Sequence, residues 1–177
     1  KGERIIYGIK FPNNLKKNEK LEKPIITPTT KAKKGHDERL TEKEIIKKKI
    51  LSAKLWKQMK KTALKLFEKG TKICDKKGLI LVDTKYEFGI YKNKLILIDE
   101  IHTPDSSRFW IKSTYRKRLS EGVEPENFDK EFLRIWLAKR GYKGEGIPPK
   151  MPKSFVDKVS KRYIDVFKKI TGKTLSV

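Results

Sequence analysis

The sequence has very little cysteine and no long apolar run. Its one cysteine, Cys74, excludes an internal disulfide and suits a reducing compartment. Because Cys74 falls within a helical pattern, we expect a packed thiol rather than a nucleophile. No apolar run approaches the roughly 20 residues that span a bilayer, and no signal peptide is visible. From these absences we expect a cytoplasmic protein without a membrane partner.

Arginine is also scarce, although the chain is strongly basic. The net charge is +23, and of the 45 basic residues 37 are lysine and eight are arginine. Proteins that read nucleic-acid sequence rely on arginine for bidentate contacts, so a lysine excess is a weak sign of that function. Lysines spread over solvated helix faces explain the charge more simply, and such a field would still attract anionic substrates. A basic nucleic-acid-binding module stays an alternative, which lysines gathered on one face would favour.

Length and composition bound the architecture. A chain of 177 residues forms one domain, or one and a half. Residues 1–40 are rich in proline, lysine and threonine, and Glu3–Phe11 is a candidate edge strand that Pro12 ends. Composition alone therefore favours a mobile, loop-rich linker over residues 1–40, followed by a main domain over residues 41–177.

Helical patterns flank the centre of the chain. Thr41 and Glu44 have the spacing of a capping box, which opens a long amphipathic helix within residues 41–77. Residues 128–137 begin a second helix, and residues 154–170 form a surface helix after a Gly/Pro-rich loop. We interpret the long helix as scaffold, with its lysines facing water.

The stretch from Leu79 to Trp110 is the longest run that is low in charge and rich in β-forming residues. A turn over residues 92–94 leads into a second strand over residues 95–101, so we predict an α/β (α+β) domain with an antiparallel hairpin at 79–101 packed on the long helix. Alternation divides the first strand into an apolar face and a charged face. The apolar face comprises Ile80, Val82, Thr84, Tyr86, Phe88 and Ile90, and the charged face comprises Asp83, Lys85 and Glu87.

The charged face is a candidate metal site. If the turn centres on Asn93, which tolerates positive φ, Glu87 lies directly opposite Asp99. Opposed like charges destabilise a strand pair unless a cation compensates them, and two carboxylates suit Mg²⁺, which takes few protein ligands. Lys85 on the same face is placed to meet an anionic substrate. A solvated polar face without function is an equally good interpretation of the alternation alone.

Collinear sequence blocks resemble those of a known family. Asp83–Gly89 reads DTKYEFG, and IDE and TPDSSRFW follow it in the central stretch. ITPTTKAKKGHDE precedes them, and FDKEFLRIWL and KMPKSFVDKVSKRYIDVFKKITG come after them. These blocks resemble those of the SAICAR synthetase (phosphoribosylaminoimidazole-succinocarboxamide synthase) family, in particular its yeast-like branch.

The resemblance implies a fold and a reaction. Family members ligate L-aspartate to carboxyaminoimidazole ribonucleotide with ATP and Mg²⁺, giving SAICAR in purine biosynthesis. Residues 1–40 would then border the substrate pocket and residues 41–177 would form the C-terminal lobe of the family fold, whose ATP cleft is similar to that of protein kinases. Nothing in residues 1–40 resembles the N-terminal β lobe of the family. We therefore expect the isolated chain to be inactive, and a non-catalytic interaction fragment that needs a partner lobe is a further alternative.

The resemblance also implies roles for individual residues. Lys85 and Asp83 would be catalytic, with Lys85 neutralising the reacting carboxylate. Arg108 would bind the ribotide phosphate while Asp105 holds it in place. Glu87 and Asp99 would hold Mg²⁺ and, through it, the nucleotide. The remaining candidate substrate-binding residues are Lys31, Asp37, Asp129, Lys130 and Arg134.

Overall fold

The computed structural model describes residues 4–32, 37–128 and 130–175. They divide into two units, residues 1–66 with 90–95 and residues 67–89 with 96–177. The boundary between these units passes through the longest helix. The division at residue 40 into a substrate-pocket segment and a catalytic lobe, which the family resemblance implied, stays a prediction.

A tight hairpin opens the first unit. β1 (Ile5–Ile6) pairs with β2 (Ile9–Lys10) in antiparallel register. The turn between them consists of Tyr7 and Gly8, which both have positive φ. The single edge strand predicted over residues 3–11 is therefore wrong within the described part of that range, because Gly8 tolerates the turn conformation that folds the chain back.

The predicted capping box is confirmed. Thr41 Oγ1 accepts from the backbone N–H of Glu44 at 3.2 Å, and Glu44 Oε2 accepts from the backbone N–H of Thr41 at 2.7 Å. The helix that it opens, α1 (Glu42–Lys47), is short, and the long helix α2 (Ala53–Lys76) begins separately. The single helix predicted within 41–77 is thus two helices, because Lys49 takes a φ of 53° between them.

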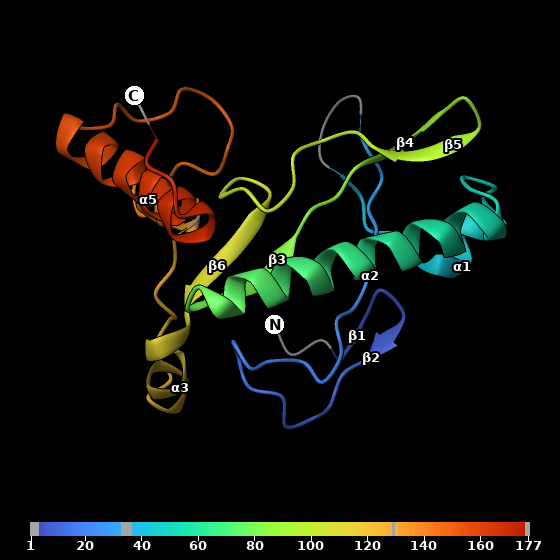
Figure 1. Ribbon diagram of the computed structural model, residues 1–177, viewed down its shortest axis with the longest axis horizontal. Helices are drawn as coiled ribbons and strands as arrows, with labels where there is room; N and C mark the ends of the chain where they lie inside the picture. The colour runs from blue at the N-terminus through green and yellow to red at the C-terminus, as the bar shows by residue number, and fades with distance from the viewer. Residues whose placement is uncertain (1–3, 33–36, 129, 176–177) are drawn as a thin grey trace. The chain divides into compact units, whose positions relative to one another are not determined.

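The strands that follow α2 pair differently from the prediction. β3 (Leu79–Thr84) pairs in antiparallel register with β6 (Ser107–Ile111), and the two lie side by side in Figure 1. β4 (Phe88–Tyr91) and β5 (Lys94–Leu97) form a two-stranded sheet of their own. The predicted hairpin at 79–101 is therefore right only for the part next to the turn, where β4 pairs with β5.

A β-bulge also breaks the predicted alternation. Leu81 pairs with Phe109 and Asp83 pairs with Arg108, so Val82 is an extra residue in β3. Leu79 and Leu81 are 0% and 4% exposed, whereas Ile80 and Val82 are only half-buried. The predicted apolar face is thus wrong at the start of the strand, where the alternate set of residues forms the core.

The core of the second unit joins the sheet to two helices. Leu79, Leu81 and Phe109 pack with Cys74 of α2 and with Val166 of α5 (Lys153–Thr171). Cys74 is 2% exposed, which confirms the packed thiol. The end of α2 therefore backs β3, as predicted for the long helix.

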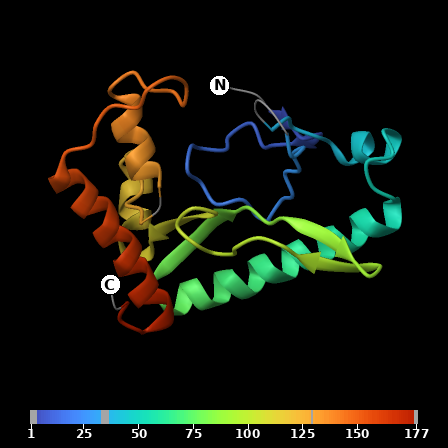
Figure 2. The same ribbon diagram turned by 90° about the horizontal axis from the view of Figure 1, so that it is seen from above.

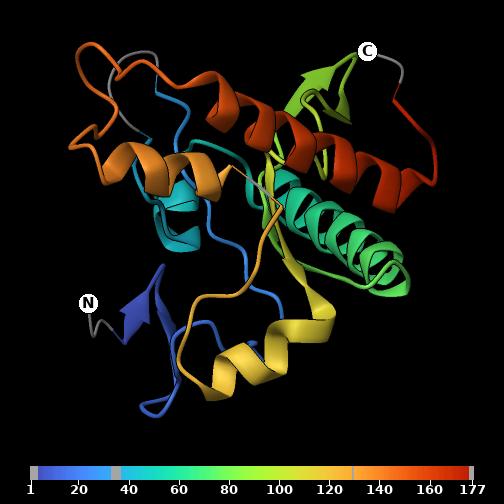
Figure 3. The same cartoon turned by 90° about the vertical axis from the view of Figure 1, so that its left-hand side faces the viewer.

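Two further helices complete this unit. α3 (Lys112–Ser120) follows directly from the end of β6 and was not predicted, because its sequence has no apolar stripe (Figure 3). α4 (Glu131–Ala138) and α5 lie side by side (Figures 2 and 3), and their aromatic rings stack at centroid distances of 4.6–5.1 Å. Among the described residues, no helix combines the length and the apolar character needed to cross a membrane.

Candidate functional site

Asp83 and Arg108 form a cross-strand ion pair that joins two of the sequence blocks. The β3–β6 register places them opposite each other. Arg108 Nε donates to the two carboxylate oxygens of Asp83 at 3.1 and 2.9 Å, and Arg108 Nη2 also donates to Asp83 Oδ2. Both side chains are about half exposed, at 50% and 48%. The guanidinium is thus held by a bidentate contact and still reaches solvent.

Asp105, which we expected to hold Arg108, has a different contact. Its Oδ1 accepts from the hydroxyl of Tyr163 on α5 at 2.9 Å. This bond ties the loop before β6 to α5. Tyr163 was not predicted as a site residue, since nothing in its helical pattern distinguishes it from a packing residue.

Lys85 and Glu87 lie together in the middle of the DTKYEFG block. Lys85 Nζ is 2.5 Å from Glu87 Oε1, and the two side chains are 59% and 12% exposed. The backbone N–H of Lys85 donates to the carbonyl of Ser106 at 2.7 Å. The residues that follow β3 are therefore fixed to the TPDSSRFW block, with Lys85 presented to solvent.

The predicted pairing of Glu87 with Asp99 is wrong by one position. The turn between β4 and β5 has two residues, Lys92 and Asn93, which both have positive φ. The backbone N–H of Ile98 donates to the carbonyl of Glu87 at 3.1 Å, so Ile98 is the residue opposite Glu87. A three-residue loop centred on Asn93 was expected because asparagine tolerates positive φ, whereas Lys92 takes positive φ as well.

Asp99 is exposed on a bend after β5, where its Oδ1 accepts from the backbone N–H of Glu100 at 3.0 Å. Within the described residues, no group of three or more His, Cys, Asp and Glu side chains is arranged to hold a metal ion. Mg²⁺ needs only one or two protein carboxylates, because water and phosphate supply its other ligands. The donor chemistry of Glu87 and Asp99 therefore still fits that ion, although their cross-strand register does not enforce it.

Tyr86 and His102 form a half-buried pair that the sequence did not predict. The Tyr86 hydroxyl is 2.7 Å from His102 Nε2. Burial raises the pKa of Tyr86 to about 12 and lowers the pKa of His102. The imidazole lies against Gly70, where an added Cβ would be 2.4 Å from His102 Cε1. Gly70 was the available signal, since a glycine inside a helix usually has a packing reason.

Hydroxyl groups link the same segments. Ser107, which is 4% exposed, donates through Oγ to Thr84 Oγ1 at 2.8 Å. In the preceding loop, the backbone N–H of Ser106 donates to Thr103 Oγ1 and the backbone N–H of Thr103 donates to Ser106 Oγ, both at 3.2 Å. The serines and threonine of the TPDSSRFW block thus shape the loop that precedes Arg108.

Lys31 and Asp37 belong to a loop of the first unit that is closed by pairing between Thr29 and Arg39. Asp37 Oδ1 accepts from the backbone N–H of Ala32 at 2.8 Å, and Lys31 is exposed. The predicted site role of both residues stays a prediction.

The three residues predicted around the start of α4 have different outcomes. Lys130 is half-buried, and its backbone N–H donates to the carbonyl of Pro104 at 3.3 Å, which links α4 to the loop before β6. Arg134 is 3.6 Å from Glu131 of the same helix. Asp129 lies outside the described residues.

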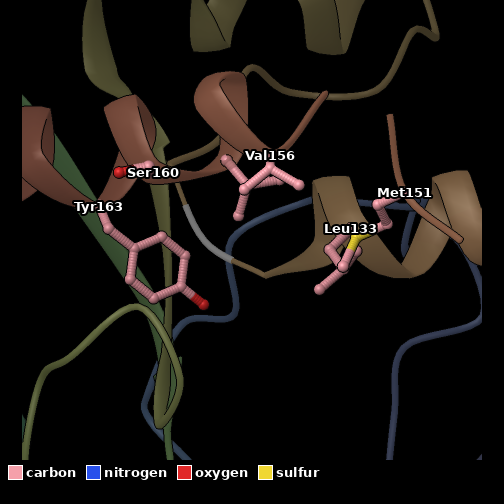
Figure 4. A pocket seen from close by; sticks show the side chains of 6 residues that line it. Leu133, Met151, Val156, Ser160 and Tyr163 are labelled. Atoms are coloured by element: carbon pink, nitrogen blue, oxygen red, sulfur yellow. The ribbon is translucent and has the colours of Figure 1, made fainter. Parts of the chain in front are cut away.

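An apolar hollow of about 330 Å³ lies between α4 and α5 (Figure 4). It is lined by Leu133, Met151, Val156, Val159, Ser160 and Tyr163. None of the predicted site residues lines it. Its Tyr163 hydroxyl donates to Asp105 in the loop before β6.

Solved SAICAR synthases share this fold. The SAICAR-synthase of Saccharomyces cerevisiae, complexed with SAICAR, matches with a TM-score of 0.77 and 33% identity over 97% of this chain and 54% of that one. A SAICAR synthetase in complex with ADP matches with a TM-score of 0.69 and 28% identity over 92% of this chain and 57% of that one. The paired strands and their helices therefore have the mixed α/β fold of a SAICAR synthase.

Sequence similarity leads to the same family. The SAICAR synthetase family model matches residues 2–150. The putative phosphoribosylaminoimidazole-succinocarboxamide synthase 2 of Agrobacterium fabrum is 48% identical over 174 residues, which are 97% of this chain and 55% of that protein. The chain belongs to the SAICAR synthetase family, and it spans about half the length of the curated relatives it matches.

Proposed function

We propose that this chain supplies part of the active site of an ATP-dependent ligase that joins L-aspartate to carboxyaminoimidazole ribonucleotide. One observation carries the proposal: the Asp83–Arg108 contact joins the DTKYEFG and TPDSSRFW blocks of a member of this family into one surface. The similarity to structures solved with SAICAR and with ADP supports the same substrate classes.

The chemistry requires charge neutralisation. A carboxylate is a poor electrophile, and ATP, as a substrate, provides the phosphoryl group that turns its oxygen into a leaving group before the amine of aspartate attacks. Catalysis then consists mainly of positioning and of compensating the charge on the phosphoryl group. Lys85 is the residue that we assign to the reacting carboxylate, because its ammonium group is exposed and its backbone is anchored to Ser106.

Arg108 is the residue that we assign to the ribotide phosphate. Its planar guanidinium suits a phosphate, and the carboxylate of Asp83 restrains it before the substrate arrives. Asp83 is on this view a positioning residue, since it acts through Arg108.

Glu87 and Asp99 would hold Mg²⁺, which would neutralise the nucleotide phosphates when bound. Glu87 already lies 2.5 Å from the Lys85 ammonium, so this carboxylate is placed to bind a cation. In the complex we expect Lys85 to turn from Glu87 toward the substrate carboxylate.

Activity should also need residues that relatives have beyond the matched part. The chain covers 55% of the Agrobacterium relative, and phosphoryl transfer needs a site that closes over the nucleotide and excludes water. We therefore propose that the described residues are necessary for ligation and insufficient for it.

The experiment measures SAICAR formation by the purified chain with ATP, Mg²⁺, aspartate and the carboxylated ribotide. It is run with and without the unmatched segment of a relative, added in trans. The expected result is turnover only when both parts are present. Turnover by the chain alone would disprove the requirement for the second part, and no turnover in either case would count against the proposed function.

Two variants test the site in the assembled enzyme. Arg108→Lys keeps the charge but loses the bidentate contact, and it should raise the KM for the ribotide at least about tenfold. Arg118→Lys is the matched control, because Arg118 also pairs with a carboxylate, that of Glu126 at 3.6 Å, outside the two blocks. Equal effects of the two substitutions would contradict the assignment of Arg108.

A further inference from the structure

The exposed face of α2 carries a continuous row of lysines. The row consists of Lys54, Lys57, Lys61, Lys65, Lys69, Lys72 and Lys76. At 3.6 residues per turn these positions fall within a sector of about 120°. All seven side chains are exposed. The row belongs to one continuous helix, so its geometry follows from that helix alone.

The opposite face of the helix is buried. Trp56, Ala63 and Cys74 are 2–9% exposed and lie on the side away from the lysines. Packing therefore fixes which face of α2 reaches solvent. The charge of the lysine row is displayed by the fold and is not an effect of composition alone.

Few acids compensate the row. Glu68 lies within the sector and pairs with Lys72 at 2.6 Å, and Asp75 at its edge pairs with Lys112 at 2.5 Å. α2 contains no other acidic residue. Along α2 the surface thus keeps a strongly positive charge from its first turn to its last.

The spacing of the row matches a regular polyanion. At a rise of 1.5 Å per residue the row is about 33 Å long, and neighbouring lysines are about 4.5–6 Å apart along the axis. A nucleic-acid duplex carries one phosphate about every 3.4 Å of its axis on each strand and completes a turn in about 34 Å, so the row spans about one turn and meets phosphates of both backbones.

We propose that this lysine row binds the phosphate backbone of double-stranded nucleic acid without reading its sequence. α2 has no arginine, the residue that reads base edges by bidentate contacts. Its aromatic residues, Trp56 and Phe67, pack in the two cores, so the row offers no ring on which an unpaired base stacks. Both observations favour contact with the backbone of a duplex.

An anionic membrane surface is the competing partner. A helix that binds a bilayer inserts its apolar face between the lipid headgroups. The apolar face of α2 is occupied by the protein cores and is not free to insert. The duplex is therefore the better fit, and this binding is independent of the ligase activity proposed above.

The test measures binding of the whole chain to a fluorescent 20-base-pair duplex of random sequence at several salt concentrations. Seven phosphate contacts would give a slope of log K against log salt concentration of up to about −6. The triple variant Lys61→Gln, Lys65→Gln, Lys69→Gln should lower the magnitude of the slope by about 3 and weaken binding at least about tenfold at 100 mM salt.

A matched control removes the same charge elsewhere. Lys158→Gln, Lys168→Gln, Lys169→Gln changes three exposed lysines of α5 and should leave the slope nearly unchanged. Equal losses in the two triple variants would show that net charge drives binding, and would overturn the proposal. So would the absence of duplex binding at 50 mM salt, tighter binding to phosphatidylserine vesicles, or equal competition by polyglutamate.

Discussion

Replacing Gly70 by alanine would put a methyl group where the His102 ring lies. A Cβ at residue 70 would be 2.4, 2.7 and 2.9 Å from three atoms of the imidazole. Real carbon contacts of this kind are about 3.5–4.0 Å, so the ring must move by about 1 Å or more. That movement would also break the contact of the ring with the Tyr86 hydroxyl at 2.7 Å.

The opposing contributions can be compared. Overpacking a core costs about 1–3 kcal/mol, and loss of the hydrogen bond costs about 1 kcal/mol. Against this, alanine is about 1 kcal/mol better than glycine inside a helix. We therefore expect Gly70→Ala to lower the free energy of unfolding by about 1–3 kcal/mol.

Urea unfolding measures the difference. With a slope of about 2 kcal/mol per molar urea, the midpoint should fall by about 0.5–1.5 M. In a His102→Ala background the sign should reverse, because the methyl group then fills vacated space and the gain in helix propensity remains. A neutral or stabilising effect of Gly70→Ala in the otherwise unchanged protein would refute the close packing on which this reasoning rests.

Three further predictions concern ionisable groups. Burial lowers the pKa of His102 below its ordinary 6.5, so the folded state binds fewer protons than the unfolded state. The free energy of unfolding should therefore fall as the pH drops through about 6.5. Urea unfolding between pH 5 and 8 should show this loss in the wild type and less of it in His102→Gln. Burial raises the pKa of the Cys74 thiol to about 11, so its reaction with a disulfide reagent at pH 8 should be roughly 100-fold slower in the folded protein than in denaturant; equal rates would contradict its burial. Asp83→Asn should cost no more than about 1 kcal/mol of stability, because the pair with Arg108 is half exposed. The same substitution should reduce ligation by the assembled enzyme at least about tenfold. Asp75→Asn, which breaks the exposed pair with Lys112, is the control and should leave activity unchanged.

Local features were predictable from the sequence. The capping box of α1 depends on Thr41 and Glu44 only, and it forms as expected. The turn at the end of α2 and the surface helix α5 likewise follow from nearby residues. Each of these elements is determined by interactions between residues close together in the sequence, so a short stretch of sequence is sufficient to predict it.

Strand partners were not predictable from the same information. Alternation indicated a strand at β3, but nothing local distinguishes a partner at residues 95–101 from the true partner at residues 107–111. The positive φ of Lys92 shortened the β4–β5 turn by one residue and displaced Asp99 from Glu87. The contact of Arg108 with Asp83 followed from the strand pairing, and it therefore could not be seen before that pairing was known.

The extra residue in β3 makes this strand tolerant of a change in its length. Leu81 and Thr84 both pair with inward-facing residues of β6, namely Phe109 and Ser107, although an odd number of positions separates them. Deleting Val82 would restore regular pairing and leave every other side chain of the strand on its present face. Elsewhere in a strand, loss of one residue turns the following side chains to the opposite face. Natural relatives and engineered variants that differ by one residue here can therefore keep the same core and the same outward-facing acid.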